Sequence, residues 1–375
     1  MIRPFISKIP DQALDDLRQR ISKTRWPDEI KNAEWRYGAS LSYIKELIQF
    51  WQNNFVWRDV ETEINSYPNF IAEIDGYNIH FLHIKGKGKD RIPIIITHGW
   101  PGSFLEMMKL IPVLSDNSEQ SFDLVIPSII GFGFSQKIDN PGCNLWLISE
   151  LWHKLMKELG YDKFVAQGGD FGAGISTALS LKHPESIIGL HLNYIPGSFL
   201  PYLNPDKPLT EEEIDFQNLA KQWYETEGAY AHQHRSKPLS LAYSLNDSPV
   251  GLCAWIVEKF YSWSDCNGDI ESVFTKNELL GNVSLYWFTE TIHSSIRLYY
   301  ENSIAPLHFA KNDFINVPVG IARFKKEEPF PPRIFIERGY KIEHWTDFNK
   351  GGHFAAMEQP SLLGNDIVKF VRQCK

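Results

Sequence analysis

The stretch Gly168-Gly-Asp-Phe-Gly-Ala-Gly174 decides the fold class of this sequence. It follows a short apolar run, residues 164–166, and precedes a segment rich in small residues, which is the setting of a strained strand-to-helix turn. The residue at the apex of such a turn has a positive φ, and small neighbours avoid clashes with it. A phosphate-binding loop is disfavoured, because the stretch lacks the P-loop lysine. The pattern predicts a nucleophile elbow that presents Asp170 at the carboxyl end of a sheet.

A second loop, His98-Gly-Trp-Pro101, directly follows the apolar run 92–97. In folds with a nucleophile elbow, this position carries the loop that completes an oxyanion hole. We expect the backbone N–H groups of Trp100 and Phe171 to converge on a developing oxyanion. His98 itself is expected to form hydrogen bonds within its own loop, without a part in proton transfer.

A histidine base is predicted at His353, where the small residues of Gly351-Gly-His-Phe-Ala-Ala leave room for the imidazole. Such a base needs an orienting carboxylate, expected between the nucleophile and the histidine in chain order. From the pattern alone the acid is one of four residues: Glu327, Glu328, Asp313 and Asp347. The competing interpretation is that Lys325-Lys-Glu-Glu328 is a solvated run of charges.

Apolar segments alternate with amphipathic helices after residue 90, which predicts a mostly parallel central sheet flanked by helices. The expected strands are residues 92–97, 122–126, 164–166, 187–192, 317–324 and 341–345. Helical patterns alone occupy residues 197–304, where Thr210 and Glu213 form a capping box. We therefore divide the chain into an N-terminal meander (1–90), a first core part (91–196), a helical cap (197–304) and a second core part (305–375).

Local signals add detail to this α/β organisation. Asp75-Gly76 predicts the tight turn of a hairpin at the edge of the sheet. Asp11 and Asn144 are expected to cap helices. Further helices are expected over residues 41–55, 145–159, 254–263 and 360–371.

Composition narrows the class of protein. The formal net charge of −8 disfavours nucleic acid and anionic membrane surfaces as partners. The 12 Trp, 15 Tyr and 24 Phe suggest that some rings line a cavity as well as a core. Four scattered cysteines without a C-x-x-C pair indicate neither a zinc site nor a disulfide framework, so a reducing cytoplasm is expected. No signal peptide or membrane span is predicted either.

Together these motifs resemble the epoxide hydrolases of the microsomal type, which have the α/β-hydrolase fold. The resemblance covers essentially the whole chain and rests on stretches in family order: Thr24-Arg-Trp-Pro-Asp28, His98 to Phe104, Gly168 to Gly174, Ser248-Pro-Val-Gly-Leu252, Leu285-Tyr-Trp-Phe-Thr-Glu-Thr291 and Gly351 to Glu358. It implies a relative without the membrane anchor of animal members. The implied partners are a lipophilic epoxide and water, with no metal or organic cofactor. A monomer and a homodimer both remain open.

The resemblance also implies particular site residues. The segment Val317-Pro-Val-Gly-Ile-Ala-Arg-Phe324 resembles one in which the acid follows three residues later, which selects Glu327 and keeps Glu328 as its alternative. Two cap tyrosines are implied at Tyr230 and Tyr299. Tyr224 lies near the first of these, and Tyr300 is adjacent to the second, so a shift of register by one keeps Tyr300 open as the second tyrosine.

The implied reaction opens an epoxide through a covalent ester on Asp170. Tyr230 and Tyr299 would protonate the epoxide oxygen, and His353 with Glu327 would activate the water that hydrolyses the ester. A haloalkane or haloacid dehalogenase uses the same Asp, His and acid and is the nearest alternative. A catalytically dead fold that serves for binding is the alternative from another class.

Overall fold

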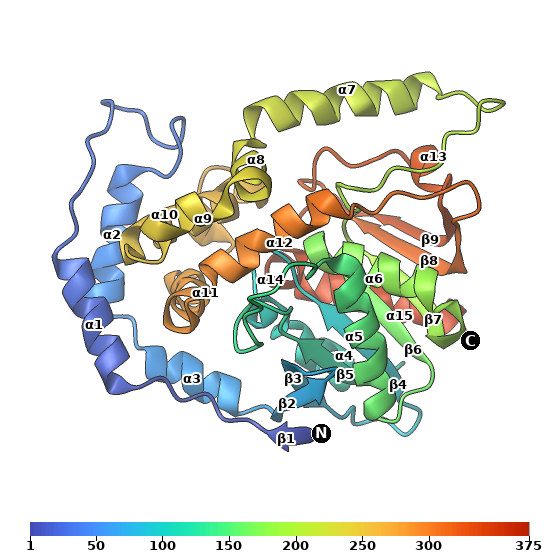
Figure 1. Ribbon diagram of the computed structural model, residues 1–375, viewed down its shortest axis with the longest axis horizontal. Helices are drawn as coiled ribbons and strands as arrows, with labels where there is room; N and C mark the ends of the chain where they lie inside the picture. Colours follow the sequence, from blue (N-terminus) through green and yellow to red (C-terminus); the bar gives the residue numbers. More distant parts are fainter. Residues whose placement is uncertain (375) are drawn as a thin grey trace.

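A nine-stranded sheet forms the centre of the molecule, in a computed structural model that describes residues 1–374 (Figure 1). The strand order is β1-β2-β3-β5-β4-β6-β7-β8-β9. Strands β1, β2 and β3 pair antiparallel, as do β3 and β5, and all other neighbours pair parallel. The strands are β1 (Ile2–Pro4), β2 (Asn69–Ile74), β3 (Tyr77–Ile84), β4 (Ile92–Thr97), β5 (Phe122–Pro127), β6 (Phe164–Gly168), β7 (Ile187–Leu192), β8 (Ile315–Arg323) and β9 (Tyr340–Asp347).

Helices cover both faces of the sheet, because the central strands are apolar on both sides. On β4, Ile95 belongs to the core under α5 and α6, whereas Ile94 and Ile96 belong to the core under α4 and α15. Successive side chains of a strand point to opposite faces, so one apolar run supplies both cores. The α/β-hydrolase fold predicted from the sequence is confirmed. The core helices are α4 (Leu110–Ser115), α5 (Leu145–Glu158), α6 (Asp170–Lys182), α13 (Arg333–Ile336), α14 (Ala355–Glu358) and α15 (Pro360–Gln373), with short 3-10 turns η1 (Phe104–Met107) and η2 (Pro184–Ser186).

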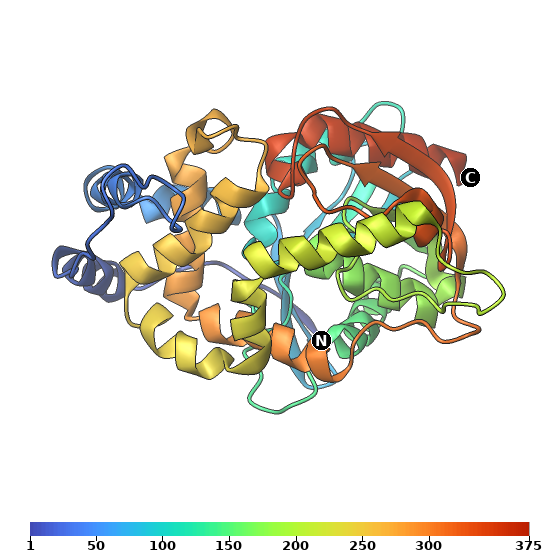
Figure 2. The same cartoon turned by 90° about the horizontal axis from the view of Figure 1, so that it is seen from above.

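Helices α7 to α12 form a separate helical layer between β7 and β8 in the chain (Figure 2). Their bounds are α7 (Glu211–Thr226), α8 (Ala229–Ser236), α9 (Pro238–Leu245), α10 (Pro249–Trp263), α11 (Lys276–Thr289) and α12 (Ile292–Ile304), with the 3-10 turn η3 (Ile270–Ser272). The predicted capping box at Thr210 and Glu213 is present at the start of α7. Glu213 also forms a buried ion pair with Arg338, which follows α13. This pair fixes the start of the cap to the core.

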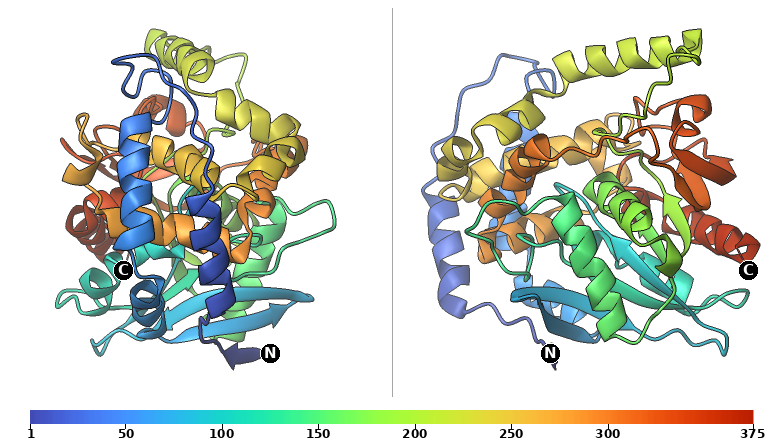
Figure 3. Two further views of the ribbon diagram at one scale, coloured as in Figure 1. Left: turned by 90° about the vertical axis from the view of Figure 1, so that its left-hand side faces the viewer. Right: turned by 45° about the vertical axis from the view of Figure 1, so that its right-hand side comes forward.

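The N-terminal segment runs along the outer side of the cap (Figure 3, left). Helices α1 (Asp11–Ser22) and α2 (Leu41–Asn53) contact α10, and α3 (Trp57–Asn65) contacts α11. The indole N–H of Trp51 donates to the hydroxyl of Ser284 in α11 over 3.1 Å. The segment therefore contacts both the cap, through its helices, and the sheet, of which its strand β1 is a part.

Three local predictions were wrong in detail. Asp11 does not cap α1: Pro10 stands at the N-cap in an extended conformation, and Asp11 is the first helical residue, paired with Arg58 at 2.5 Å. The hairpin β2–β3 is not the edge of the sheet, because β1 pairs with β2 outside it. The helix expected from residue 254 begins at Pro249, where the hydroxyl of Ser248 accepts the Gly251 N–H. The cap predicted at Asn144 is confirmed.

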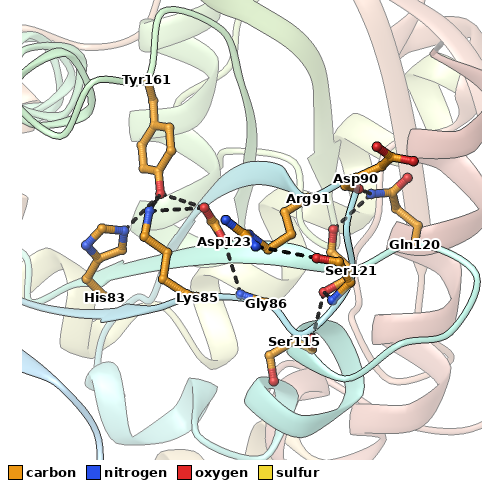
Figure 4. Close-up of polar contacts among 11 residues, drawn as sticks. His83, Lys85, Gly86, Asp90, Arg91, Ser115, Gln120, Ser121, Asp123 and Tyr161 are labelled. Atoms are coloured by element: carbon orange, nitrogen blue, oxygen red, sulfur yellow. Dashed lines mark hydrogen bonds and ion pairs between the residues drawn. The ribbon is translucent and has the colours of Figure 1, made fainter.

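A polar network closes the end of the sheet where the parallel strands begin (Figure 4). The buried Asp123 of β5 accepts hydrogen bonds from Tyr161 at 2.8 Å and from the Gly86 N–H at 3.0 Å. It also pairs with Lys85 at 3.1 Å and with Arg91 at 2.8 Å. Burial by itself would raise the pKa of Asp123, but the hydrogen bonds and Lys85 have the larger combined effect and lower it. The network is structural, because it lies at the opposite end of these strands from Asp170.

Candidate active site

The turn between β6 and α6 presents Asp170 with a φ of +46°, the strained backbone predicted for an elbow. The glycines around it are required by close packing. A Cβ on Gly172 would collide with the carbonyl of Thr97, and one on Gly168 would collide with the backbone of Gly172. The turn can therefore form only where small residues flank Asp170.

The loop after β4 lies directly against the nucleophile candidate. The Trp100 N–H donates to Oδ1 of Asp170 over 2.8 Å. The imidazole of His98 is engaged within the loop region, with Nδ1 3.0 Å from the Gly99 carbonyl and Nε2 accepting the Ile129 N–H at 3.2 Å. Burial lowers the pKa of His98 to about 4. It is thus a neutral residue that shapes the loop, as the sequence predicts.

Two residues of the cap helix α11 hold the same loop from the other side. The amide of Asn282 donates to the Pro101 carbonyl over 2.8 Å, and the hydroxyl of Tyr286 donates to the Gly102 carbonyl over 2.7 Å. Asn282 and Tyr286 are one helical turn apart, so they face the loop together. Sequence reasoning missed both, although their i, i+4 spacing was a usable signal.

His353 lies between two carboxylates. Its Nε2 is 3.7 Å from Oδ2 of Asp170, and its Nδ1 is 2.9 and 3.1 Å from the two oxygens of Glu327. Its loop is bonded to the cap, since the His353 N–H donates to the Trp263 carbonyl over 2.9 Å. The Gly351 N–H donates to Oδ2 of Asp265 over 3.0 Å.

The four carboxylates considered for the acid lie in different places. Only Glu327 reaches His353. The side chain of Glu328 is 52% exposed and pairs with Arg323 at 3.0 Å. Asp313 accepts the Ala310 N–H and Asp347 accepts the Trp345 indole N–H, both away from His353.

The charges of the site are coupled. Burial opposes protonation of His353, but the carboxylates of Glu327, Asp170 and Glu106 outweigh it and raise the pKa of His353 to about 9. Burial also raises the pKa of Asp170, although His353 and the N–H groups of Trp100 and Phe171 counteract it. Burial raises the pKa of Glu106 to about 8. Glu106 was not predicted, and nothing in its sequence context marks it as part of the site.

Two tyrosines from the cap pack on the residues around Asp170. The ring of Tyr230 from α8 stacks on Trp100 with centroids 5.5 Å apart and an interplanar angle of 9°. The ring of Tyr299 from α12 meets Trp100 edge-on at 5.8 Å and Phe171 at 4.7 Å. The hydroxyl of Tyr299 is buried without a hydrogen-bond partner, so it is a donor available to a ligand.

The neighbouring tyrosines lie elsewhere. Tyr300 is 40% exposed. The ring of Tyr224 carries the guanidinium of Arg235 at 4.8 Å. Burial raises the pKa of Tyr230 and of Tyr299 well above 10, so both carry their protons at neutral pH.

Residues 1–374 contain one group with ligand atoms close enough to hold a metal ion: His153, His183 and Glu185. None of these belongs to the site around Asp170. Within the same residues, no helix has the length and apolar character to cross a membrane. The four cysteines are free.

The fold and the site define an α/β hydrolase with a carboxylate at the elbow, a histidine–carboxylate pair beside it and phenols above it. Residues 2–107 match the family described as epoxide hydrolase N terminus, and residues 92–253 match the α/β hydrolase fold. The chain is 40% identical over its whole length to an epoxide hydrolase relative from Stigmatella aurantiaca, covering 86% of that protein. It is 37% identical to epoxide hydrolase 1 of Sus scrofa, over 99% of this chain and 88% of the relative. The chain belongs to the epoxide hydrolase family of the microsomal type.

Solved structures agree with this assignment. The epoxide hydrolase of Aspergillus niger superposes with a TM-score of 0.87 at 30% identity, over 100% of this chain and 97% of that chain. The juvenile hormone epoxide hydrolase of Bombyx mori superposes with a TM-score of 0.86 at 28% identity, over 100% and 94% of the two chains. The likeness therefore extends over the N-terminal segment and the cap as well as the core.

Proposed function

We propose that the protein hydrolyses lipophilic epoxides to vicinal diols through a covalent ester on Asp170. The observation that supports this most strongly is the combination at the elbow. A carboxylate stands at the apex where other hydrolases carry a serine, and a buried, unpartnered phenol from the cap lies against the adjacent Phe171. A carboxylate forms an ester by attack on carbon, and a phenol protonates the oxygen that leaves.

In the first half-reaction Asp170 attacks one carbon of the epoxide ring. The carbon–oxygen bond of the ring breaks, and a phenol of Tyr230 or Tyr299 gives its proton to the oxygen. The Trp100 N–H holds Oδ1 of Asp170, which leaves Oδ2, on the His353 side, free to attack. The products are a neutral ester, a hydroxyl group and a tyrosinate.

The second half-reaction depends on the charge that the first one removes. Esterified Asp170 no longer stabilises an imidazolium, so the pKa of His353 falls below its resting value of about 9. The imidazolium gives its proton to the tyrosinate, and neutral His353, oriented by Glu327, then takes a proton from water as this water attacks the ester carbonyl. The N–H groups of Trp100 and Phe171 then stabilise the tetrahedral oxyanion. Collapse expels the alkoxide of the diol, which takes the proton from His353, and the proton left on the Asp170 carboxyl passes to His353 and restores the resting state.

The lining of the site favours apolar substrates. The ring of Trp100, whose N–H bonds Asp170, packs against those of Trp263, Tyr230 and Tyr299. The ring of Trp263 also meets that of His353. Such walls bind hydrocarbon by burial and leave recognition of the epoxide to the phenols. Relatives from Ctenocephalides felis and Bombyx mori are juvenile hormone epoxide hydrolases, which fits a lipophilic substrate class.

The test is a panel of styrene-type, aliphatic terminal and terpene epoxides, with chloro- and bromoalkanes of matched size. We expect diols from the epoxides and no halide release from the haloalkanes. A single turnover in heavy-oxygen water should place the label in Asp170 and not in the first diol formed. Label in that first diol would exclude the ester, and halide release without diol formation would favour a dehalogenase.

A further inference from the structure

A buried lysine lies beside one of the two cap tyrosines. Lys259 is on α10, and its side chain is only 9% exposed. Its ammonium is 4.8 Å from the ring centroid of Tyr230 and 5.5 Å from that of Trp263. Lysines are rarely buried unless they are paired, so this placement calls for a reason.

The ammonium of Lys259 also forms an ion pair. Its partner is the neighbouring Glu258, at 2.6 Å, whose side chain is more exposed than that of Lys259. Glu258 also accepts the Ser262 hydroxyl at 2.7 Å. The Lys259 ammonium therefore contacts the Glu258 carboxylate and lies over two aromatic rings. These contacts stabilise a cation that is removed from water.

The other charged groups near Tyr230 oppose loss of its proton. Burial, the carboxylates of Asp170 and Glu327 and the phenol of Tyr194 raise the pKa of Tyr230. The Tyr299 hydroxyl lowers it but carries no positive charge. Burial and the Lys259 ammonium lower the pKa of the adjacent His234 to about 3, so this imidazole is neutral. Among residues 1–374, Lys259 provides the cation recorded over the Tyr230 ring.

We propose that Lys259 is a positioning residue that makes Tyr230, rather than Tyr299, the proton donor of ring opening. The inference rests on the proposed function. As the Tyr230 O–H proton passes to the epoxide oxygen, the ring carbon–oxygen bond breaks and the bond from Asp170 to carbon forms. The electron pair left on Tyr230 makes a tyrosinate, which the ammonium stabilises in this poorly solvated place. Tyr299 then contributes a hydrogen bond to the same oxygen and keeps its proton.

The experiment is single-turnover kinetics on Lys259→Met, which keeps an apolar stem and removes the charge. We expect ester formation to slow by about 10- to 100-fold, because a desolvated charge contact is lost, while ester hydrolysis keeps its rate. The loss should shrink for epoxides with electron-withdrawing substituents, whose alkoxides need less protonation. Lys259→Arg should recover most of the rate. Glu258→Gln, which removes the opposing charge, should not slow ester formation.

A double-mutant cycle separates the two tyrosines. The Lys259→Met loss should vanish in a Tyr230→Phe background and persist in a Tyr299→Phe background. The matched control is Lys182→Met, since Lys182 also lies over an indole, at 5.5 Å from Trp146, but on α6 at the surface. Unfolding curves check each variant, and Lys259→Gln replaces Lys259→Met if that variant does not fold.

The outcomes distinguish this inference from the proposed function. If the unmodified protein turns over no epoxide, the proposed function fails. If it does, and Lys259→Met forms the ester at the normal rate, the role of Lys259 is refuted. A loss that is equal in ester formation and hydrolysis, or equal in both tyrosine backgrounds, also refutes it.

Discussion

Replacing Glu327 with glutamine asks whether its charge, and not only its hydrogen bond, makes His353 a base. Both carboxylate oxygens lie within 3.1 Å of Nδ1 of the imidazole, and glutamine keeps an acceptor of similar shape. Burial alone would lower the pKa of His353, and Glu327 is the largest cause that opposes it. We therefore expect Glu327→Gln to bring the pKa of His353 down from about 9 toward or below its ordinary value of 6.5.

The size of the effect on catalysis follows from the contact. His353 becomes an imidazolium as water attacks the ester, and a hydrogen bond between charged partners contributes about 1.5–3 kcal/mol. Its loss should slow ester hydrolysis by about 10- to 150-fold. Ester formation needs no base and should keep its rate. In the unmodified protein, hydrolysis rises with pH as His353 loses its proton. In the variant, this rise should move to lower pH and reach a lower plateau.

Stopped-flow tryptophan fluorescence can separate the two steps, because Trp100 and Trp263 line the site. Glu328→Gln is the matched control, since Glu328 is adjacent in sequence but half-exposed and paired with Arg323. The reasoning is refuted if Glu327→Gln hydrolyses the ester at the normal rate with an unchanged pH profile. A loss in Glu328→Gln instead would transfer the acid to Glu328.

Three further predictions concern other contacts. Tyr299→Phe should slow ester formation and Tyr300→Phe should not, because the Tyr299 hydroxyl is buried at the site and Tyr300 is exposed. Single-turnover kinetics on the two variants measure the rate of ester formation. Arg338→Met leaves Glu213 buried and unpaired, so thermal and urea unfolding should show a loss of about 3–5 kcal/mol, and a loss under 1 kcal/mol would contradict it. Asp366→Asn should cost about 2 kcal/mol at neutral pH. The histidine partners lower the pKa of Asp366 despite its burial. The difference in unfolding free energy between the unmodified protein and the variant should therefore narrow as acid protonates the carboxylate, and urea unfolding at several pH values measures it.

The sequence predicts best where local sterics determine the structure. The elbow needs glycine at position 168 because the backbone of Gly172, in the same turn, occupies the place of a Cβ, so this part of the motif can be read without tertiary information. Gly172 differs, because its missing Cβ makes room for the Thr97 carbonyl of β4. The alternation of apolar runs and helices likewise predicts the sheet. In contrast, β1 has three residues and acquires its structure only by pairing with β2, which leaves no signal in its own sequence.

The choice between neighbouring residues depends on tertiary contacts. Glu327 and Glu328 occupy one turn, yet one lies at His353 and the other at Arg323. Their orientation is tied to the histidine loop, since the Lys326 N–H donates to the Gly351 carbonyl over 2.9 Å. Such a bond between distant segments cannot be read from composition or spacing. The resemblance favoured Glu327 only because it brought information from other chains.

The cap does more than cover the site, and this limits how a substrate can enter. Helix α11 holds the loop after β4 through Asn282 and Tyr286, and the residues at the end of α10 hold the loop of His353 through the Trp263 carbonyl and Asp265. If the whole cap lifted as one body, all four contacts would break and the groups around Asp170 would lose their supports. Movement of α10 or α11 to admit a substrate would therefore disturb the site itself. The α7 end is tied down as well, by the ion pair of Glu213 with the core. Helix α12 is bound to the core too: the Ser294 hydroxyl donates to the Gly131 carbonyl, and Glu301 and Asn302 accept the N–H groups of Gly142 and Leu145. Tyr299, which α12 carries, is thus held in place by contacts with the core, so any movement of this helix for substrate entry would also move the phenol.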